Sequence, residues 1–186
     1  EPSDVKLTFE KGELIAVDGE KDSPINNIEK LNAMASKYAI GRDIHVGDTI
    51  IGIKGRVGFE AAASLIIIKA HHLLEKHTLT KWQQYQKEQL GNFYGMLLHE
   101  GNYLDEVMRN IEAFLTDTQK NVSGDVFVSL YPFQFRLNGI SSEHDLMNAS
   151  FGSYGEINKG WTADDAKGFI KILSNSGKIY NHVNPH

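Results

Sequence analysis

The sequence predicts an α+β protein with a mixed or antiparallel sheet, a central block of helices and a C-terminal helical segment. Two observations support this class. Strand-like alternation occurs near residues 5–17 and again at 126–137, whereas residues 59–115 mostly follow helical spacing. Strands and helices are therefore segregated along the chain, unlike the strict alternation of a doubly wound fold.

The first strands are expected to form a hairpin. Residues 5–9 alternate apolar and polar side chains, and a turn at residues 11–12 leads into the apolar run 14–17. Ser23 can then cap a helix that begins at Pro24, because proline suits the first helical turn, where no N–H is needed. The apolar positions of this helix are Ile25, Ile28, Leu31, Ala35 and Tyr38.

A glycine-rich segment follows, and we expect it to be flexible with one short strand at residues 50–53. Lys54 and Arg56 lie among its glycines, and glycine amides beside two cations can hold carboxylate or phosphate oxygens. A glycine-rich turn with two solvated cations is the alternative, and composition alone leaves both open. The glycines are Gly41, Gly47, Gly52, Gly55 and Gly58.

Three helices are predicted in the middle of the chain. Residues 59–79 form the first, whose wide apolar surface suggests burial on more than one side. Thr80 caps the second, which carries Trp82. The third begins near Tyr103 and places an apolar stripe on one face. That stripe comprises Leu104, Val107, Met108, Ile111, Phe114 and Leu115.

The C-terminal third is expected to return to the sheet and then to end in a helical segment. Residues 126–130 and 133–137 form two strands separated by Pro132. A polar loop is expected at residues 148–160. A capping box at residues 162–165 then predicts a helix through Ile172.

Composition limits the possible partners. The 186 residues suffice for one well-buried domain, and a formal charge of −5 provides no basic field to attract nucleic acid or an anionic membrane. The chain has no cysteine, which excludes disulfides and thiolate nucleophiles and is consistent with a cytoplasmic location. Its longest apolar run, residues 65–68, is too short to cross a bilayer.

The sequence contains no familiar catalytic motif. It lacks His-Glu-x-x-His, Gly-x-Ser-x-Gly and a phosphate-binding glycine loop after a strand. The eight histidines do not predict a metal site, because His71 and His72 are adjacent and point to different helix faces. Residues 75–77 and 99–100 are interpreted as solvated helix surface. Motifs alone therefore assign no catalytic residue.

Several short motifs nevertheless occur in the order that is typical of argininosuccinate synthases. They are Phe9-Glu-Lys-Gly-Glu13, Ser23-Pro24, Ile40-Gly-Arg42, Gly52-Ile-Lys54, Arg56, Phe59-Glu-Ala61, Ile68-Lys-Ala-His71, Leu73 to Glu75, Thr78-Leu-Thr80, Thr118-Gln-Lys-Asn121 and Gly168-Phe-Ile-Lys171. Nearly the whole chain thus resembles the C-terminal synthetase and multimerisation domain of that family. We expect residues 1–186 to form this domain without the family's N-terminal ATP-binding domain and its Ser-Gly-Gly-x-Asp-Thr-Ser loop.

The resemblance implies an ATP-dependent ligase of arginine biosynthesis. In the complete enzyme the ureido oxygen of citrulline attacks the α-phosphorus of ATP, and pyrophosphate leaves. The amine of aspartate then displaces AMP from citrullyl-AMP to give argininosuccinate. This chemistry needs positioned phosphates and Mg²⁺ more than a protein nucleophile. ATP and Mg²⁺ are expected on the other domain, so this chain alone is expected to be inactive, with no catalytic, cofactor-binding or metal-binding residue.

The family uses this region for late citrulline contacts and for assembly of a homotetramer. Two contact positions align without a gap: the first usually holds Glu and is Gly47 here, and the second usually holds Tyr and is Phe59. Lys54 and Arg56 keep the surrounding pattern and complete the expected substrate-binding set. Both polar contacts to a free α-ammonium are lost, which favours an N-acylated substrate such as N-succinyl-citrulline. Ordinary citrulline held by other residues is the alternative.

A different class of function is also open. A non-catalytic oligomerisation or binding module could keep this fold after losing the ligand contacts, and a native start near Glu1 would favour it. Self-association is expected through the helix that contains Met108 or through the segment after Trp161. Packing of that helix within its own chain is the alternative.

Overall fold

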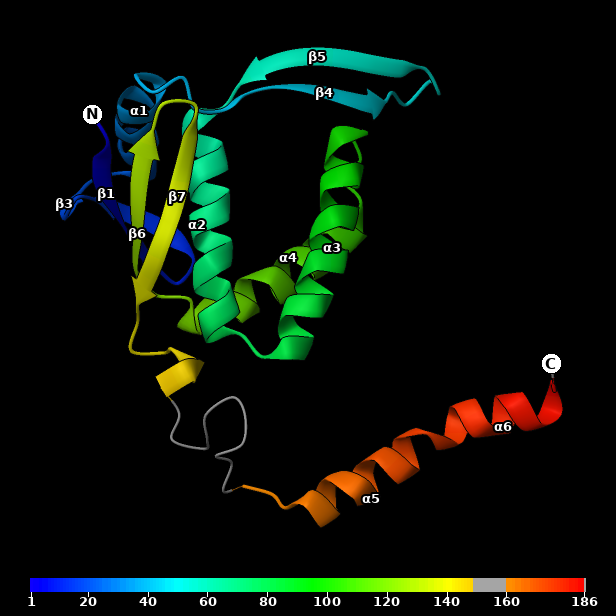
Figure 1. The fold of residues 1–186 in the computed structure, drawn as a ribbon. Coiled ribbons are helices and arrows are strands. Elements are labelled where there is room, and N and C mark those ends of the chain that lie inside the picture. The colour runs from blue at the N-terminus through cyan, green and yellow to red at the C-terminus, as the bar shows by residue number, and fades with distance from the viewer. Residues whose placement is uncertain (149–159, 186) are drawn as a thin grey trace. The chain divides into compact units, whose positions relative to one another are not determined.

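The computed structural model describes residues 1–148 and 160–185, and the chain divides into two compact units, residues 1–146 and 147–186. In its described part, the first unit contains a five-stranded sheet, a separate two-stranded hairpin and four α-helices (Figure 1). The described residues of the second unit form two α-helices. The predicted α+β class is confirmed, and every strand pair among residues 1–148 and 160–185 is antiparallel.

The five-stranded sheet joins the two ends of the first unit. Its order is β3-β2-β1-β6-β7, so the N-terminal hairpin pairs with the later one through β1 and β6. Lys11 and Gly12 have positive φ at the first turn, and Phe133 has a φ of 67° at the second. Both predicted strand pairs are confirmed. The strands are β1 (Ser3–Glu10), β2 (Glu13–Val17), β3 (Glu20–Lys21), β6 (Gly124–Tyr131) and β7 (Gln134–Ser141).

Helix α1 (Pro24–Ser36) packs on β2 and on the neighbouring helix α2. The predicted cap is confirmed, since the Ser23 hydroxyl accepts a hydrogen bond from the Asn26 N–H at 3.2 Å. The predicted apolar stripe is only partly buried. Leu31 lies in the core, whereas Ile25 is 68% exposed, because it lies off the helix face that buries Asn27 and Leu31.

Helix α2 (Ala62–Thr78) packs on α1, β6 and β7 and completes the core of the first unit. It begins three residues later than predicted, because Phe59 and Glu60 belong to a strand. Its fully buried apolar side chains form one main stripe that includes Ile66 and Leu74, while Ile68 is exposed on another side. Burial of this helix is therefore concentrated on one side, and the prediction of burial on more than one side was wrong.

Helices α3 (Lys81–His99) and α4 (Glu106–Thr118) pack on each other, and the short helix η1 (Gln119–Asn121) returns the chain to the sheet. Thr80 forms the predicted cap. All of α3 lies in the described part of the chain, and none of its residues is fully buried. Trp82 is largely exposed. In α4 the predicted stripe contributes Met108 to the protein interior, which supports packing within the chain.

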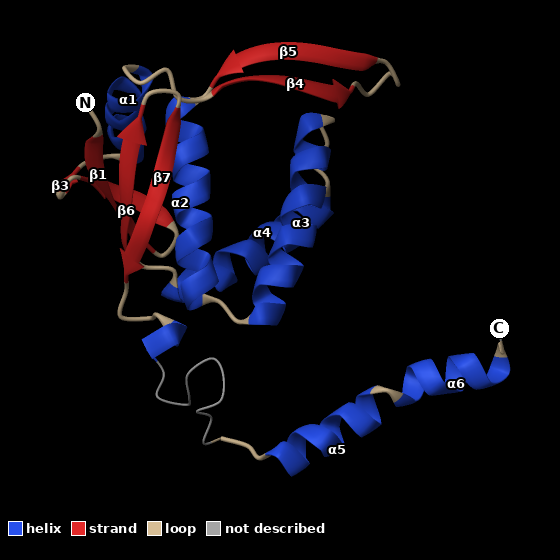
Figure 2. Ribbon diagram, in the orientation of Figure 1, coloured by secondary structure: helices blue, strands red, loops and turns tan. Residues whose placement is uncertain are grey.

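The glycine-rich segment is a regular antiparallel hairpin, here called the β4–β5 hairpin, made of β4 (Arg42–Asp48) and β5 (Lys54–Glu60). It forms its own two-stranded sheet and extends away from the five-stranded one (Figure 2). The predicted single strand at residues 50–53 was wrong, because these residues form the turn. Thr49 closes that turn, with its hydroxyl donating to the Ile53 carbonyl at 2.7 Å.

The second unit contains α5 (Ala163–Leu173) and α6 (Asn175–Val183). The predicted capping box is confirmed: the Asp165 N–H donates to the Thr162 hydroxyl at 3.3 Å. Most of the predicted polar loop, residues 149–159, lies outside the described residues. Across the described parts of both units, no helix has the length and apolar character needed to span a membrane.

Candidate functional site on the β4–β5 hairpin

Strand register sorts the hairpin side chains onto two faces. Opposed residues share a face, and successive residues alternate between faces. Gly47 pairs with Gly55 and Asp43 pairs with Phe59, so these residues share one face with His45 and Val57. We call it the glycine face. The other face, here called the charged face, carries Arg42, Ile44, Val46, Asp48, Lys54, Arg56, Gly58 and Glu60.

The expected substrate-binding residues are divided between these two faces. Gly47 and Phe59 lie on the glycine face, whereas Lys54 and Arg56 lie on the charged face. Phe59 lies four residues beyond Gly55, the partner of Gly47. At the rise of an extended strand, that spacing separates the two positions by about 13 Å. A ligand would therefore have to extend along the glycine face to contact both.

The charged face carries an ion pair near each end. Lys54 Nζ lies 2.6 Å from Asp48 Oδ1 beside the turn, and Arg42 Nε lies 2.9 Å from Glu60 Oε1 at the base. All four side chains are mostly exposed. Exposed pairs of this kind each contribute about 0–1 kcal/mol, so they support the register only weakly.

The glycine face has a strip of bare backbone where its two glycines oppose each other. A Cβ built on Gly47 would lie 2.5 Å from His45 Nε2, so the tip of the imidazole stands over the position that a side chain at residue 47 would occupy. A Cβ on Gly55 would lie 3.5 Å from the Thr49 methyl group. The strip is thus bordered by His45 on one side and Thr49 on the other.

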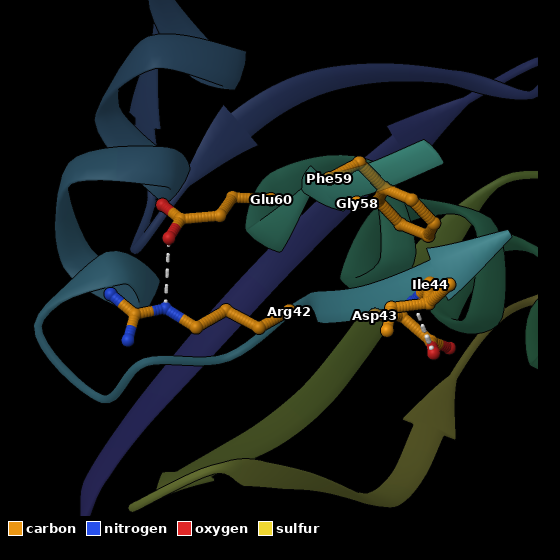
Figure 3. Close-up of a pocket in the computed structure, with 6 residues that line it drawn as sticks. All are labelled: Arg42, Asp43, Ile44, Gly58, Phe59 and Glu60. Carbon is orange, nitrogen blue, oxygen red and sulfur yellow. Dashed lines mark hydrogen bonds and ion pairs between the residues drawn. The ribbon is translucent and has the colours of Figure 1, made fainter. Parts of the chain in front are cut away.

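The base of the hairpin borders an open depression of about 680 Å³. Figure 3 shows the Arg42 and Glu60 side chains extending to the same side and joined by their ion pair, with the Phe59 ring directed away from them. The carboxylate of Asp43 accepts a hydrogen bond from the Ile44 N–H at 2.6 Å. This depression is lined by Arg42, Asp43, Ile44, Gly58, Phe59 and Glu60.

A second polar cluster lies on α2, and its centre is buried. Glu75 is only 2% exposed, and its Oε1 forms an ion pair with Lys87 Nζ and accepts a hydrogen bond from Gln119 Nε2, both at 2.9 Å. The interpretation of residue 75 as solvated helix surface was therefore wrong. Burial lowers the pKa of the neighbouring His71 despite the nearby Glu75 carboxylate. The cluster ties α2 to α3 and η1, which indicates a structural role.

Residues 1–148 and 160–185 contain no group of three or more histidine, aspartate or glutamate side chains that could hold a metal ion. Sequence reasoning also missed His45, which carries no motif. Its place two residues before Gly47 would have identified it once the segment was known to be a strand, because the two residues then share a face.

Comparison with known proteins identifies the family of this chain. The family model described as "Arginosuccinate synthase C-terminal domain" matches residues 1–180. Argininosuccinate synthases of Xanthomonas campestris, Dictyoglomus turgidum and Xylella fastidiosa are 36%, 34% and 34% identical to this chain. The alignments cover 97%, 97% and 99% of the chain but only 45% of each relative. The chain thus spans less than half the length of these relatives, and it belongs to the argininosuccinate synthase family through that family's C-terminal domain.

Proposed function

We propose that this chain is the C-terminal part of an ATP-dependent carbon–nitrogen ligase that joins citrulline, or an N-acylated citrulline, to aspartate. The products are argininosuccinate or its N-acyl form, AMP and pyrophosphate, formed through a citrullyl-AMP intermediate. Family membership over residues 1–180 and the names of the relatives support this assignment. ATP and Mg²⁺ would bind the part of the longer protein that this chain does not contain, and the enzyme would act in the cytoplasm.

The glycine face carries the substrate proposal. A free α-ammonium is stabilised by a carboxylate and a hydroxyl, and burying it without such partners is costly. Gly47 offers neither group, and the phenyl ring of Phe59 has no hydroxyl. Acylation turns the ammonium into a neutral amide and removes that cost. We therefore propose an N-acyl-citrulline, with N-succinyl-citrulline as the leading candidate.

The strand register limits which cations can assist. Lys54 and Arg56 lie on the charged face, away from Gly47, and Lys54 is paired with Asp48. Neither cation therefore lies on the face where an acyl carboxylate over Gly47 would need a partner. Both remain proposed substrate-binding residues only for groups that reach the charged face.

We also propose that the complete enzyme is a homo-oligomer, with a tetramer as the expected form, and that the second unit contributes to assembly. Large apolar side chains are exposed on α5 and α6, and such surfaces are typical of subunit contacts. They include Phe169, Ile170, Ile172, Leu173, Ile179 and Tyr180. Light scattering of the full-length protein tests this, and a monomer at every concentration would contradict it.

Product analysis tests the reaction itself. The full-length protein, supplied with ATP, Mg²⁺, aspartate and either citrulline or N-succinyl-citrulline, should release AMP and pyrophosphate together with the matching condensation product. The isolated chain should bind Mg-ATP no more tightly than about 100 μM, roughly −5.5 kcal/mol. The loss of both familiar contacts also fits a non-catalytic module, and the absence of turnover with every substrate would favour that alternative.

A further inference from the structure

The bare strip of the glycine face leaves one polar side chain at its border that the proposed reaction has not used. We propose that His45 is a specificity-determining residue whose imidazole Nε2–H donates a hydrogen bond to the terminal carboxylate of a dicarboxylic acyl group on citrulline. This assignment rests on the proposed function and names the chemical class of the acyl group: an anionic chain such as succinyl, as opposed to a neutral one such as acetyl.

The geometry depends on the glycine at position 47. His45 and Gly47 are two residues apart on β4, so both point to the glycine face. The ring tip of His45 lies where a Cβ of residue 47 would stand, with Nε2 at 2.5 Å and Cδ2 at 3.3 Å from that position. Any larger residue at position 47 would have to displace the imidazole. Gly47 therefore leaves the space that the imidazole tip uses to place a nitrogen donor at the border of the strip.

The presence of Gly47 in place of the family's usual Glu, with His45 beside it, reverses the charge that the site can recognise. A carboxylate at position 47 accepts hydrogen bonds and attracts an ammonium, whereas an imidazole N–H donates and, when protonated, attracts an anion. A carboxylate that accepts from an imidazole N–H forms a charge-assisted hydrogen bond, because the acceptor is ionised, and such a bond is about twice as strong as a neutral one. The site thus changes from one suited to a cation into one suited to an anion.

Thr49, at the other border of the strip, has no free hydrogen-bond donor for this role. The Thr49 hydroxyl donates to the Ile53 carbonyl at 2.7 Å and accepts from the Ile53 N–H at 3.1 Å, so it is committed to the turn. The Thr49 methyl group is the part that faces Gly55. Across the strand pair, His45 opposes the apolar residue Val57. The strip therefore combines a flat backbone surface for an acyl chain with one polar group beside it.

Steady-state kinetics of the full-length protein with His45→Ala tests the assignment. The KM for N-succinyl-citrulline should rise roughly tenfold or more, while kcat changes by less than about twofold, because a hydrogen bond to a charged group is lost in binding and not in the chemical step. The KM for N-acetyl-citrulline, which has no terminal carboxylate, should stay unchanged. His45→Gln should restore part of the loss through its amide donor. Val46→Ala, on the charged face of the same strand, is the matched control and should change neither KM.

The possible results separate this inference from the function on which it rests. If the wild-type enzyme prefers N-succinyl-citrulline but His45→Ala affects the succinyl and acetyl substrates alike, or affects neither, the role of His45 is overturned and the function stands. If the wild-type enzyme prefers free citrulline, the substrate proposal is overturned, and the assignment of His45 with it. Circular dichroism of His45→Ala should match the wild type, because the side chain is exposed on the hairpin surface.

Discussion

The five-stranded sheet and the β4–β5 hairpin are both antiparallel, yet different interactions hold them. In the sheet, β1 and β6 bury alternate side chains such as Leu7 and Val128 against the helices. In the hairpin, Ile44 and Val57 are more than half exposed, and exposed ion pairs lie near the two ends. Stability is therefore concentrated in the sheet and its helices, while the exposed residues of the hairpin can vary with little loss of stability.

The largest contrast should appear when an isoleucine is truncated in each region. Ile66→Ala removes a fully buried side chain of α2 and should lower the free energy of unfolding by about 2–5 kcal/mol. Ile44→Ala, the matched change in the hairpin, should cost less than about 0.5 kcal/mol, because Ile44 is already exposed. Urea unfolding of the chain measures both. Equal losses would show that the hairpin is a cooperative part of the core.

A pair of glutamate substitutions compares a buried polar cluster with an exposed ion pair. Glu75→Ala leaves Lys87 and Gln119 without their buried acceptor and should cost about 1–3 kcal/mol. Glu60→Ala removes the partner of Arg42 on the hairpin and should cost less than about 1 kcal/mol. Urea unfolding again reports the difference. A larger loss for Glu60→Ala would place more stability in the hairpin than this comparison allows.

Gly47→Glu should alter recognition without altering the fold. The new carboxylate would displace His45 and repel an anionic acyl group, so kcat/KM for N-succinyl-citrulline should fall by about tenfold or more, equivalent to roughly 1.4 kcal/mol. Use of free citrulline should fall much less. Kinetics of the full-length variant measures both substrates. A uniform loss for both would indicate distortion of the strand and no selective effect.

The smallest expected effect is a pH dependence of the sheet and helices. Burial lowers the folded-state pKa of His71 below its ordinary value of about 6.5, so the unfolded chain binds the proton first as the pH falls. The free energy of unfolding should therefore decrease below about pH 6.5. In His71→Gln this decrease should be shallower than in the wild type. Urea unfolding at pH 7 and pH 5 tests this, and an equal decrease in the free energy of unfolding for both proteins would contradict it.

Local sequence patterns predicted the elements that bury a regular apolar face or carry a side-chain cap. The alternation of residues 5–17 and the caps at Ser23, Thr80 and Thr162 depend only on near neighbours. The β4–β5 hairpin was missed because Gly47, Gly55 and Gly58 weaken strand propensity, and because its apolar residues are not packed on the main sheet. The hairpin forms through pairing between β4 and β5, and the residue pattern of either strand alone does not predict that pairing.

The candidate site was predictable only in part. Gly47 and Phe59 were selected because they depart from a family pattern, and that comparison needs no geometry. The division between the glycine face and the charged face depends on register, which separates Lys54 and Arg56 from Gly47. The position of the His45 ring depends on the missing side chain two residues away. Both features require the paired strands.

We propose that the glycine face accepts an N-acylated citrulline, and one competition assay tests this directly. The full-length enzyme is given equal concentrations of citrulline and N-succinyl-citrulline with limiting aspartate, ATP and Mg²⁺, and mass spectrometry measures the ratio of the two products. That ratio equals the ratio of the two kcat/KM values. N-succinyl-argininosuccinate should be the main product. A product mixture dominated by argininosuccinate would contradict the account.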